Sequence, residues 1–206
     1  MAHDIHHASE LLFTKLPREW SLAALGTGDH WTVTTPDGAE LVTIGEPLLT
    51  NPLRRAWQAF TPVYPASDRF HCFEFRTGPE SVLFELEKPP STEKYAAVRR
   101  PGGEELGRLL FSPSRVEEKK VCLRMRDASG TSLGEALRVT DHRSPSDPLG
   151  YALYGDDGAP IATLTGVPHR VADFQGSYRL SIPAPLPEPL RTLVLATALA
   201  CPYMRV

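Results

Sequence analysis

The sequence predicts an α+β protein that is mainly β, with an antiparallel sheet curled around one buried C-terminal helix. Two observations predict this class. From Trp31 onward, runs of alternating apolar and polar residues are separated by short turns that contain glycine, which is typical of β-hairpins. The apolar stretch at residues 189–201 is apolar around its whole circumference, as in a fully buried helix. A sheet that curls around this helix would bury it and leave no exposed edges.

The hairpins follow one another along the chain. They span residues 31–44 with a turn at Asp37-Gly38, 73–87 with a turn at Gly78-Pro79, 95–111 with a turn at Gly102-Gly103, 121–139 around Ser129-Gly130, and 151–164 with a turn at Asp157-Gly158. A lone strand at residues 178–182 then leads through a proline-rich linker to the helix. This pattern indicates about eleven strands and one buried helix.

The limits of the helix can be read from its prolines. Pro189 suits the first turn, where its missing N–H is not needed, and Pro202 ends the helix near Cys201. The apolar run is shorter than the roughly 20 residues that cross a bilayer, and Arg191 and Arg205 flank it. We therefore expect a core helix at about 189–201 rather than a membrane span.

The domain organisation that we predict has two parts. Residues 1–29 form an N-terminal segment that is partly irregular, and residues 30–206 form a single barrel domain, because the hairpins recur without a break in composition. Within the first part, residues 9–16 fit either a short helix capped by Ser9 or a first strand. Periodicity does not decide between the two.

Charge and cysteine usage limit the function classes. A formal net charge of -3 over 206 residues gives no general attraction to nucleic acid or anionic lipid, so such binding would need a local patch. The three cysteines, Cys72, Cys122 and Cys201, are far apart, which favours free thiols over a disulfide framework or a zinc site. The first residues lack a basic segment followed by an apolar run, so we expect no secretory signal and a cytoplasmic location.

Several stretches together are typical of one family. They are residues 73–89, the Leu106-Gly107 and Leu133-Gly134 pairs, residues 151–162, and Tyr178-Arg-Leu-Ser-Ile-Pro183 before the proline-rich linker and apolar helix. Through them, the chain resembles the tubby C-terminal-like superfamily, which includes phospholipid scramblases and LURP-one-related proteins. The resemblance covers residues 30–206 and implies a closed barrel of about twelve strands around the C-terminal helix.

The chain departs from this family at its ligand sites. Scramblase-like proteins carry a calcium-binding acidic segment before the final helix and acylated cysteines in an early loop. Here residues 172–187 contain Asp173 as their single carboxylate, whereas Ca²⁺ takes about 6–8 oxygen ligands. The loop at residues 47–69 contains no cysteine, and no basic motif matches a phosphoinositide pocket. We therefore predict no metal site and no cofactor.

One long loop combines basic and aromatic residues. It is punctuated by prolines, and loops of this length are commonly functional. Its basic groups could contact lipid headgroups and its rings could lie at a membrane interface. The predicted ligand-binding residues are Arg54, Arg55, Trp57, Phe60 and Tyr64. The alternative is a loop that packs over one end of the barrel.

No pattern indicates catalysis. Asp29-His30 and Asp141-His142 pair a carboxylate with an imidazole, but no nucleophile motif accompanies them. The N-terminal residues His3, Asp4, His6 and His7 have ligand chemistry, but we expect a frayed terminus there. We therefore predict no catalytic residue and no enzyme activity.

These inferences lead to three functional hypotheses. The first is a non-enzymatic cytoplasmic barrel that binds lipid headgroups or another amphipathic ligand, with a peripheral contact to the membrane. The second is a protein-interaction or scaffold domain that uses the same aromatic loop. The third is scramblase-like lipid transfer. Nucleic acid is not a predicted partner, and the sequence leaves the oligomeric state open.

Overall fold

The computed structural model describes residues 5–16, 30–45, 71–89, 94–111, 121–139, 150–167 and 177–203. These residues form twelve strands and one helix. The elements are β1 (Glu10–Lys15), β2 (His30–Thr34), β3 (Glu40–Gly45), β4 (His71–Gly78), β5 (Ser81–Lys88), β6 (Tyr95–Arg99), β7 (Glu105–Phe111), β8 (Val121–Asp127), β9 (Ser132–Arg138), β10 (Gly150–Gly155), β11 (Pro160–Val167), β12 (Ser177–Ser181) and α2 (Leu190–Tyr203).

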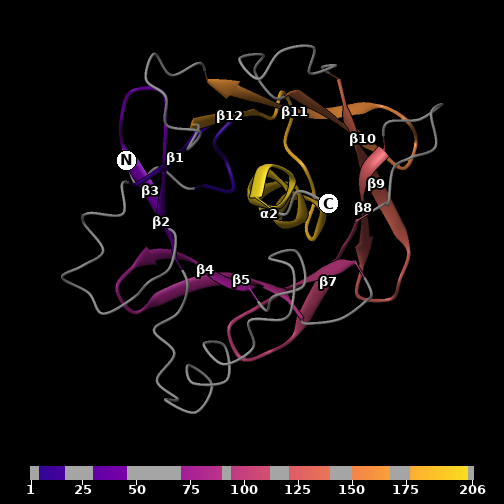
Figure 1. Cartoon of the computed structure of the whole chain (residues 1–206), viewed down its shortest axis with the longest axis horizontal. Coiled ribbons are helices and arrows are strands. Elements are labelled where there is room, and N and C mark those ends of the chain that lie inside the picture. Colours follow the sequence, from indigo (N-terminus) through magenta and orange to yellow (C-terminus); the bar gives the residue numbers. More distant parts are fainter. Residues whose placement is uncertain are drawn as a thin grey trace, which may run out of the picture.

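The twelve strands form one closed antiparallel barrel. Each strand pairs with its neighbours in the sequence, and β1 closes the ring by pairing with both β12 and β2. Figure 1 shows the ring of strands with α2 at its centre. This arrangement confirms the predicted fold class, and closure leaves none of the twelve strands with an open edge.

Residues 10–15, which fitted either a helix or a strand, form strand β1. The strand alternates between the two faces of the sheet, so that Leu11 and Phe13 are buried. Its register places Leu11 opposite Leu180 of β12 and Phe13 opposite Val33 of β2. The barrel therefore includes a strand from the segment that precedes residue 30.

The five predicted hairpins are confirmed. They are β2–β3, β4–β5, β6–β7, β8–β9 and β10–β11, each with its two strands paired directly. Glycine is needed at turns such as those of Gly38 and Gly130, where φ is 89° at both positions. The Gly38 N–H donates to the Thr35 carbonyl at 3.0 Å, and the Gly130 N–H donates to the Asp127 carbonyl at 3.0 Å.

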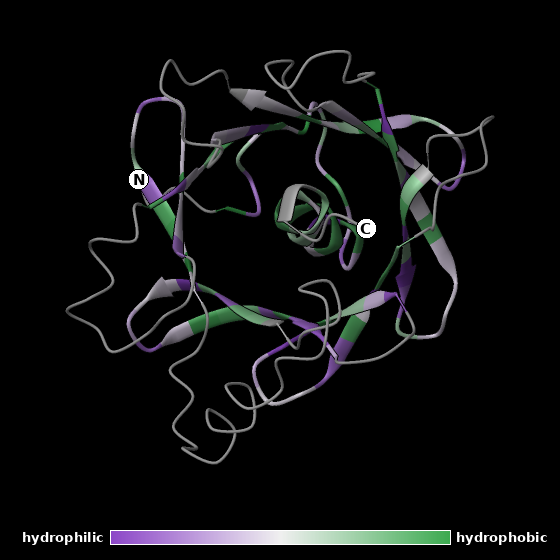
Figure 2. Cartoon of the chain, viewed as in Figure 1, coloured by the Kyte–Doolittle hydropathy of each residue, from purple (hydrophilic) through white to green (hydrophobic). Residues whose placement is uncertain are grey.

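The core consists of the inward-facing strand residues packed around α2. Every side chain from Arg191 to Ala200 is buried, and Figure 2 shows apolar residues along the helix inside the ring. Rings pack beside one another on the inner face of the barrel: the centroids of Trp31 and Phe73 are 5.4 Å apart in an edge-to-face arrangement. The helix and the sheet therefore share one hydrophobic core.

Burial of α2 is a large stabilising contribution to the fold. Leu193, Val194, Leu195 and Leu199 are each at most 2% exposed. At about 1.5–3 kcal/mol for each side chain, these four contribute roughly 6–12 kcal/mol before entropic costs. That sum is comparable to the net stability of a typical domain, about 5–15 kcal/mol. We therefore expect the helix and the barrel to unfold together.

Two glycines in the strands allow neighbouring backbone, and at one position the core helix, to pack closely against them. A Cβ at Gly107 would lie 2.3 Å from the Arg126 carbonyl oxygen and 3.2 Å from the Leu193 methyl groups on α2. At Gly134, where φ is +152°, a Cβ would lie 2.2 Å from the Tyr154 carbonyl oxygen. The Leu-Gly pairs noted in the sequence therefore have a packing role in this chain.

Gly107→Ala should strongly destabilise the barrel, because the new methyl group meets backbone and a helix side chain at once. We expect a loss of about 3 kcal/mol, which lowers the melting temperature by roughly 6–12 °C. The matched control is Gly78→Ala on β4, where nothing lies within 4 Å of the added Cβ. Equal melting temperatures for the two variants in thermal denaturation would contradict the close packing of β7 on α2.

Candidate functional site

The binding residues predicted from the sequence lie outside the described residues. Arg54, Arg55, Trp57, Phe60 and Tyr64 all belong to residues 46–70. Their role in binding therefore stays a prediction. The described residues offer three other polar regions: one at each end of α2, and one on the outer surface of the barrel.

The beginning of α2 is held by a buried arginine. Arg191 is 3% exposed, and its Nη2 donates to the carbonyl oxygens of Ile5 at 2.7 Å and Ala8 at 2.5 Å. Glu188 accepts a hydrogen bond from the Thr192 hydroxyl at 2.7 Å and pairs with His6 Nδ1 at 3.2 Å. These bonds hold residues 5–8 against the first turn of the helix. We assign a structural role to this region, because its hydrogen bonds join residues 5–8 and Glu188 to the first turn of the helix.

Two thiols interact near the other end of the helix, although no spacing along the chain had related them. Cys201 is buried near the end of α2, and Cys122 lies in a β-bulge of β8, where the pairing passes from Val121 opposite Leu137 to Leu123 opposite Ala136. The Cys122 Sγ donates to the Ala136 carbonyl at 3.1 Å. A bulge can redirect a side chain, and this one places Cys122 beside the core.

The environment makes the two thiols different. The hydrogen bond with Cys201 lowers the pKa of the Cys122 thiol below its ordinary value, and the charge of Arg138 acts in the same direction, whereas burial opposes it. The same hydrogen bond, together with burial, raises the pKa of the Cys201 thiol. Burial also raises the pKa of Tyr151, whose hydroxyl donates to the Cys201 carbonyl at 3.4 Å. We call Cys122, Cys201, Tyr151 and Arg138 the thiol cluster.

The outer surface of β4, β5 and β6 carries paired charges. Arg99 bonds Glu87 at 2.6 Å, and the Arg76 Nε donates to Glu74 at 2.8 Å. Glu85 lies directly opposite Glu74 on one side and Arg99 on the other. Partial burial, and then repulsion from Glu74 and Glu87, raise the pKa of Glu85. The arginines of this surface are therefore occupied by carboxylates of the same surface.

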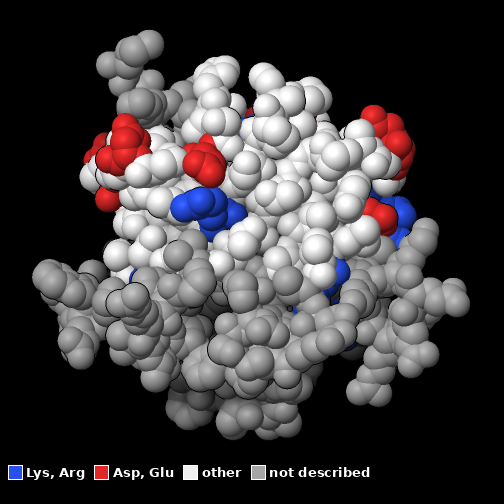
Figure 3. All heavy atoms as spheres, turned by 90° about the horizontal axis from the view of Figure 1, so that it is seen from above, with Lys and Arg blue, Asp and Glu red and all other residues white. Residues whose placement is uncertain are grey.

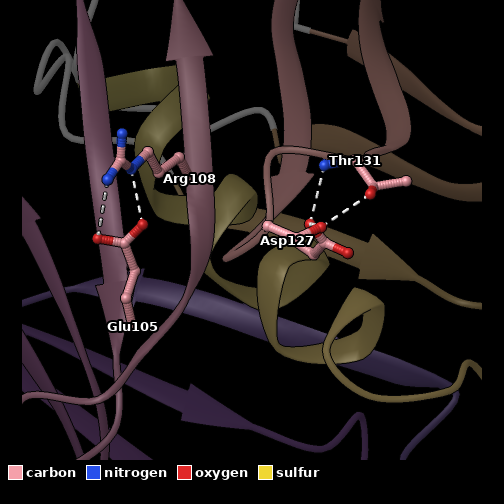
Figure 4. Close-up of polar contacts among 5 residues, drawn as sticks. Glu105, Arg108, Asp127 and Thr131 are labelled. Atoms are coloured by element: carbon pink, nitrogen blue, oxygen red, sulfur yellow. Dashed lines mark hydrogen bonds and ion pairs between the residues drawn. The ribbon is translucent and has the colours of Figure 1, made fainter.

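The neighbouring surface of β7 and β8 has a different charge arrangement. Arg108 lies directly opposite Arg126, and Arg124 lies one outward-facing position along β8; all three side chains are exposed. Arg108 is paired with Glu105 at 2.6 Å (Figure 4). It also lies over the ring of Tyr95, 5.5 Å from its centroid. Within the described ranges, Arg124 and Arg126 have no carboxylate within 4.0 Å.

We call this surface, formed by Arg108, Arg124, Arg126, Tyr95 and Leu110, the arginine face. Leu110 lies opposite both Tyr95 and Arg124, so apolar and aromatic groups border the charges. The sequence signal was present in the alternation Arg124-Met125-Arg126, in which the buried residue separates two outward arginines. The face combines basic and aromatic groups, the chemistry that was expected of the long loop.

Other charges of this region serve the turns. The carboxylate of Asp127 accepts hydrogen bonds from the Ser129 hydroxyl at 2.6 Å and the Thr131 N–H at 2.9 Å (Figure 4). The bond from Ser129 makes the largest contribution, and together these bonds lower the pKa of Asp127. Asp127 therefore stabilises the β8–β9 turn. On the side of the barrel where Figure 1 has β11 and β12, Figure 3 shows scattered charges of both signs among uncharged residues.

Two further findings concern metals and membranes. Among the described residues, no group of three or more His, Cys, Asp or Glu side chains could hold a metal ion. Within the same residues, no helix has the length and apolar character needed to cross a membrane. His3, Asp4 and the Asp29 and Asp141 partners of the two Asp-His pairs lie outside the described residues.

The fold and its surface define a class of protein: a closed antiparallel barrel of twelve strands around a core helix, with an exposed arginine face. Comparison with known proteins found no matching family model, no matching curated protein and no matching solved structure. The similarity to tubby-like barrels therefore stays a prediction from the sequence.

Glu85→Gln should stabilise the protein at neutral pH. Since the pKa of Glu85 is raised in the folded state, folding favours its protonated form, and stability falls as the pH rises through the range where Glu85 ionises. The uncharged glutamine avoids this loss. We expect a higher melting temperature at pH 7 and no difference below about pH 4, where carboxylates are largely protonated.

The matched control is Glu87→Gln, which removes the partner of Arg99 and should give no gain at pH 7. An equal effect of the two substitutions, or a gain for Glu85→Gln that persists at low pH, would contradict the charge arrangement described for β4, β5 and β6.

Proposed function

We propose that this protein is a non-enzymatic barrel that binds anionic phospholipid headgroups at a membrane surface, and that the arginine face makes the contact. The observation that carries the proposal is the pair Arg124 and Arg126, exposed on one strand without a carboxylate partner in the described part of the chain. An unpaired arginine can bind a phosphate without first breaking an ion pair, and its planar fork matches phosphate geometry.

The charges around the pair favour an anionic ligand. Arg126 faces Arg108 directly, and like charges opposite each other are destabilising unless an anion lies between them. Glu105 already neutralises Arg108 in part, and Glu135 of β9 lies opposite Arg124 without an ion pair within 4.0 Å, so Arg126 supplies most of the uncompensated charge and Arg124 adds to it. Tyr95 adds an amphipathic ring of the kind that lies at the membrane interface. These features support a contact with a lipid surface.

The long loop is a second contact in this proposal. Arg54, Arg55, Trp57, Phe60 and Tyr64 have the same basic and aromatic chemistry, and they would add to the binding energy of the arginine face. A cytoplasmic location remains part of the proposal. The competing hypotheses are a protein-interaction domain that uses the same surfaces and scramblase-like lipid transfer.

The test is co-sedimentation with vesicles of phosphatidylcholine alone or mixed with phosphatidylserine, with and without calcium. At low salt, we expect binding to the anionic vesicles that weakens as the ionic strength rises. Each basic residue near an anionic surface contributes about 1 kcal/mol, so the Arg124→Ala, Arg126→Ala double variant should bind about 30-fold more weakly.

The matched control is the Arg100→Ala, Arg179→Ala double variant, which removes the same formal charge from arginines that lie near carboxylates. It should bind almost as the unaltered protein does. Equal losses in both double variants would indicate general charge attraction and overturn the role of the arginine face. A separate Arg54→Ala, Arg55→Ala, Trp57→Ala variant measures how much the long loop contributes to vesicle binding. The absence of binding to every vesicle would favour the protein-interaction hypothesis.

A further inference from the structure

The thiol cluster carries an inference that does not depend on the proposed function. Cys122 and Cys201 are 79 positions apart by their residue numbers, yet both pack into the same core, where β8 lies against α2 and the two thiols influence each other. Both are free thiols. We propose that Cys122 and Cys201 form a redox-active pair, in which Cys122 reacts first with a peroxide and Cys201 then closes a disulfide between β8 and α2.

The two cysteines are placed for different steps. Cys122 is partly buried at the bulge, whereas Cys201 is 8% exposed, so Cys122 is the more exposed of the two residues. The lowered pKa of Cys122 increases the fraction of thiolate, which is the nucleophilic form. The raised pKa of Cys201 keeps its thiol protonated, so Cys122 is the thiol that reacts first. Cys201 gives up its proton when its sulfur attacks the Cys122 sulfur.

The chemistry balances with a hydroperoxide as the oxidant. The Cys122 thiolate attacks one peroxide oxygen, so that an S–O bond forms, the O–O bond breaks, and the leaving oxygen departs as water after protonation. The Cys201 sulfur then attacks the Cys122 sulfur, the S–S bond forms, the S–O bond breaks, and a second water leaves with the Cys201 proton. Two thiols are oxidised, and one hydrogen peroxide is reduced to two waters.

The rest of the cluster is arranged around this bond. The Tyr151 hydroxyl donates to the Cys201 carbonyl, and the Cys122 Sγ donates to the Ala136 carbonyl, so each cysteine is hydrogen-bonded to a neighbouring strand. Arg138 lies opposite Tyr151 on β9 and favours the thiolate of Cys122. The disulfide would tie the end of the core helix to the strand that carries Arg124 and Arg126.

The third cysteine provides an internal control. Cys72 lies on β4, whereas Cys122 lies on β8, four strands further round the barrel. A reaction controlled by the fold should therefore exclude Cys72. In a denatured chain the three thiols would compete, and this selectivity would be lost.

The experiment treats the reduced full chain with a small excess of hydrogen peroxide. Remaining thiols are alkylated, and the protein is digested without reduction for mass spectrometry. We expect one linked peptide pair that joins Cys122 to Cys201, a mass lower by two hydrogens, alkylated Cys72, and reversal by dithiothreitol. Because the bond closes a long loop, the melting temperature should rise by an amount on the order of 10 °C.

Variants separate the two steps. Cys201→Ala should leave Cys122 as a sulfenic acid that a nucleophilic probe can trap, Cys122→Ser should abolish the reaction, and Cys72→Ala should behave as the unaltered chain. Alkylated Cys122 and Cys201 after treatment, oxidised Cys122 without a bond to Cys201, or a bond to Cys72 would each overturn the proposal. Since the mapping uses the unaltered protein, it remains decisive if Cys201→Ala does not fold.

Discussion

Burial of α2 inside the closed sheet is the interaction on which the rest of the structure depends. The helix has no solvent-facing side, and the inward residues of the strands form a single core with it. Closure by β1 between β12 and β2 completes this core and removes the sheet edges. The strand glycines follow from the same constraint, because Gly107 lets β7 approach Leu193 on the helix. Among the described residues, the side chains available for binding are therefore on the outer face and at the two ends of the helix.

The two ends of the helix differ in chemistry for physical reasons. At the first turn, the guanidinium of Arg191 satisfies the carbonyl groups of Ile5 and Ala8, and this contact fixes the N-terminal residues over the core. At the last turn, Cys201 belongs to the core and the bulge residue Cys122 packs against that core, so a buried thiol interacts with a more exposed one. The outer face is independent of both ends, because alternation along β8 turns Arg124 and Arg126 away from the core.

Much of the fold could be predicted from the sequence, whereas most of the candidate sites could not. The hairpins were predictable because alternation and glycine turns such as Gly38 are local signals, and the helix because its apolar residues surround its axis. The meeting of Cys122 with Cys201 depends on a bulge and on the path of the chain around the barrel, which local patterns do not encode. The burial of Arg191 was not predicted either, because a charged residue at the end of an apolar helix was expected to mark the limit of the buried segment.

The most direct test of the central claim is native-state hydrogen exchange of the α2 backbone amides as a function of urea. If the helix is the shared core, amides from Thr192 to Ala200 should exchange only through global unfolding, with the same free energy and urea dependence as those of β5 and β8. Exchange of the α2 amides at lower free energy, while the strands remain protected, would show a helix that leaves a stable barrel and would contradict the account.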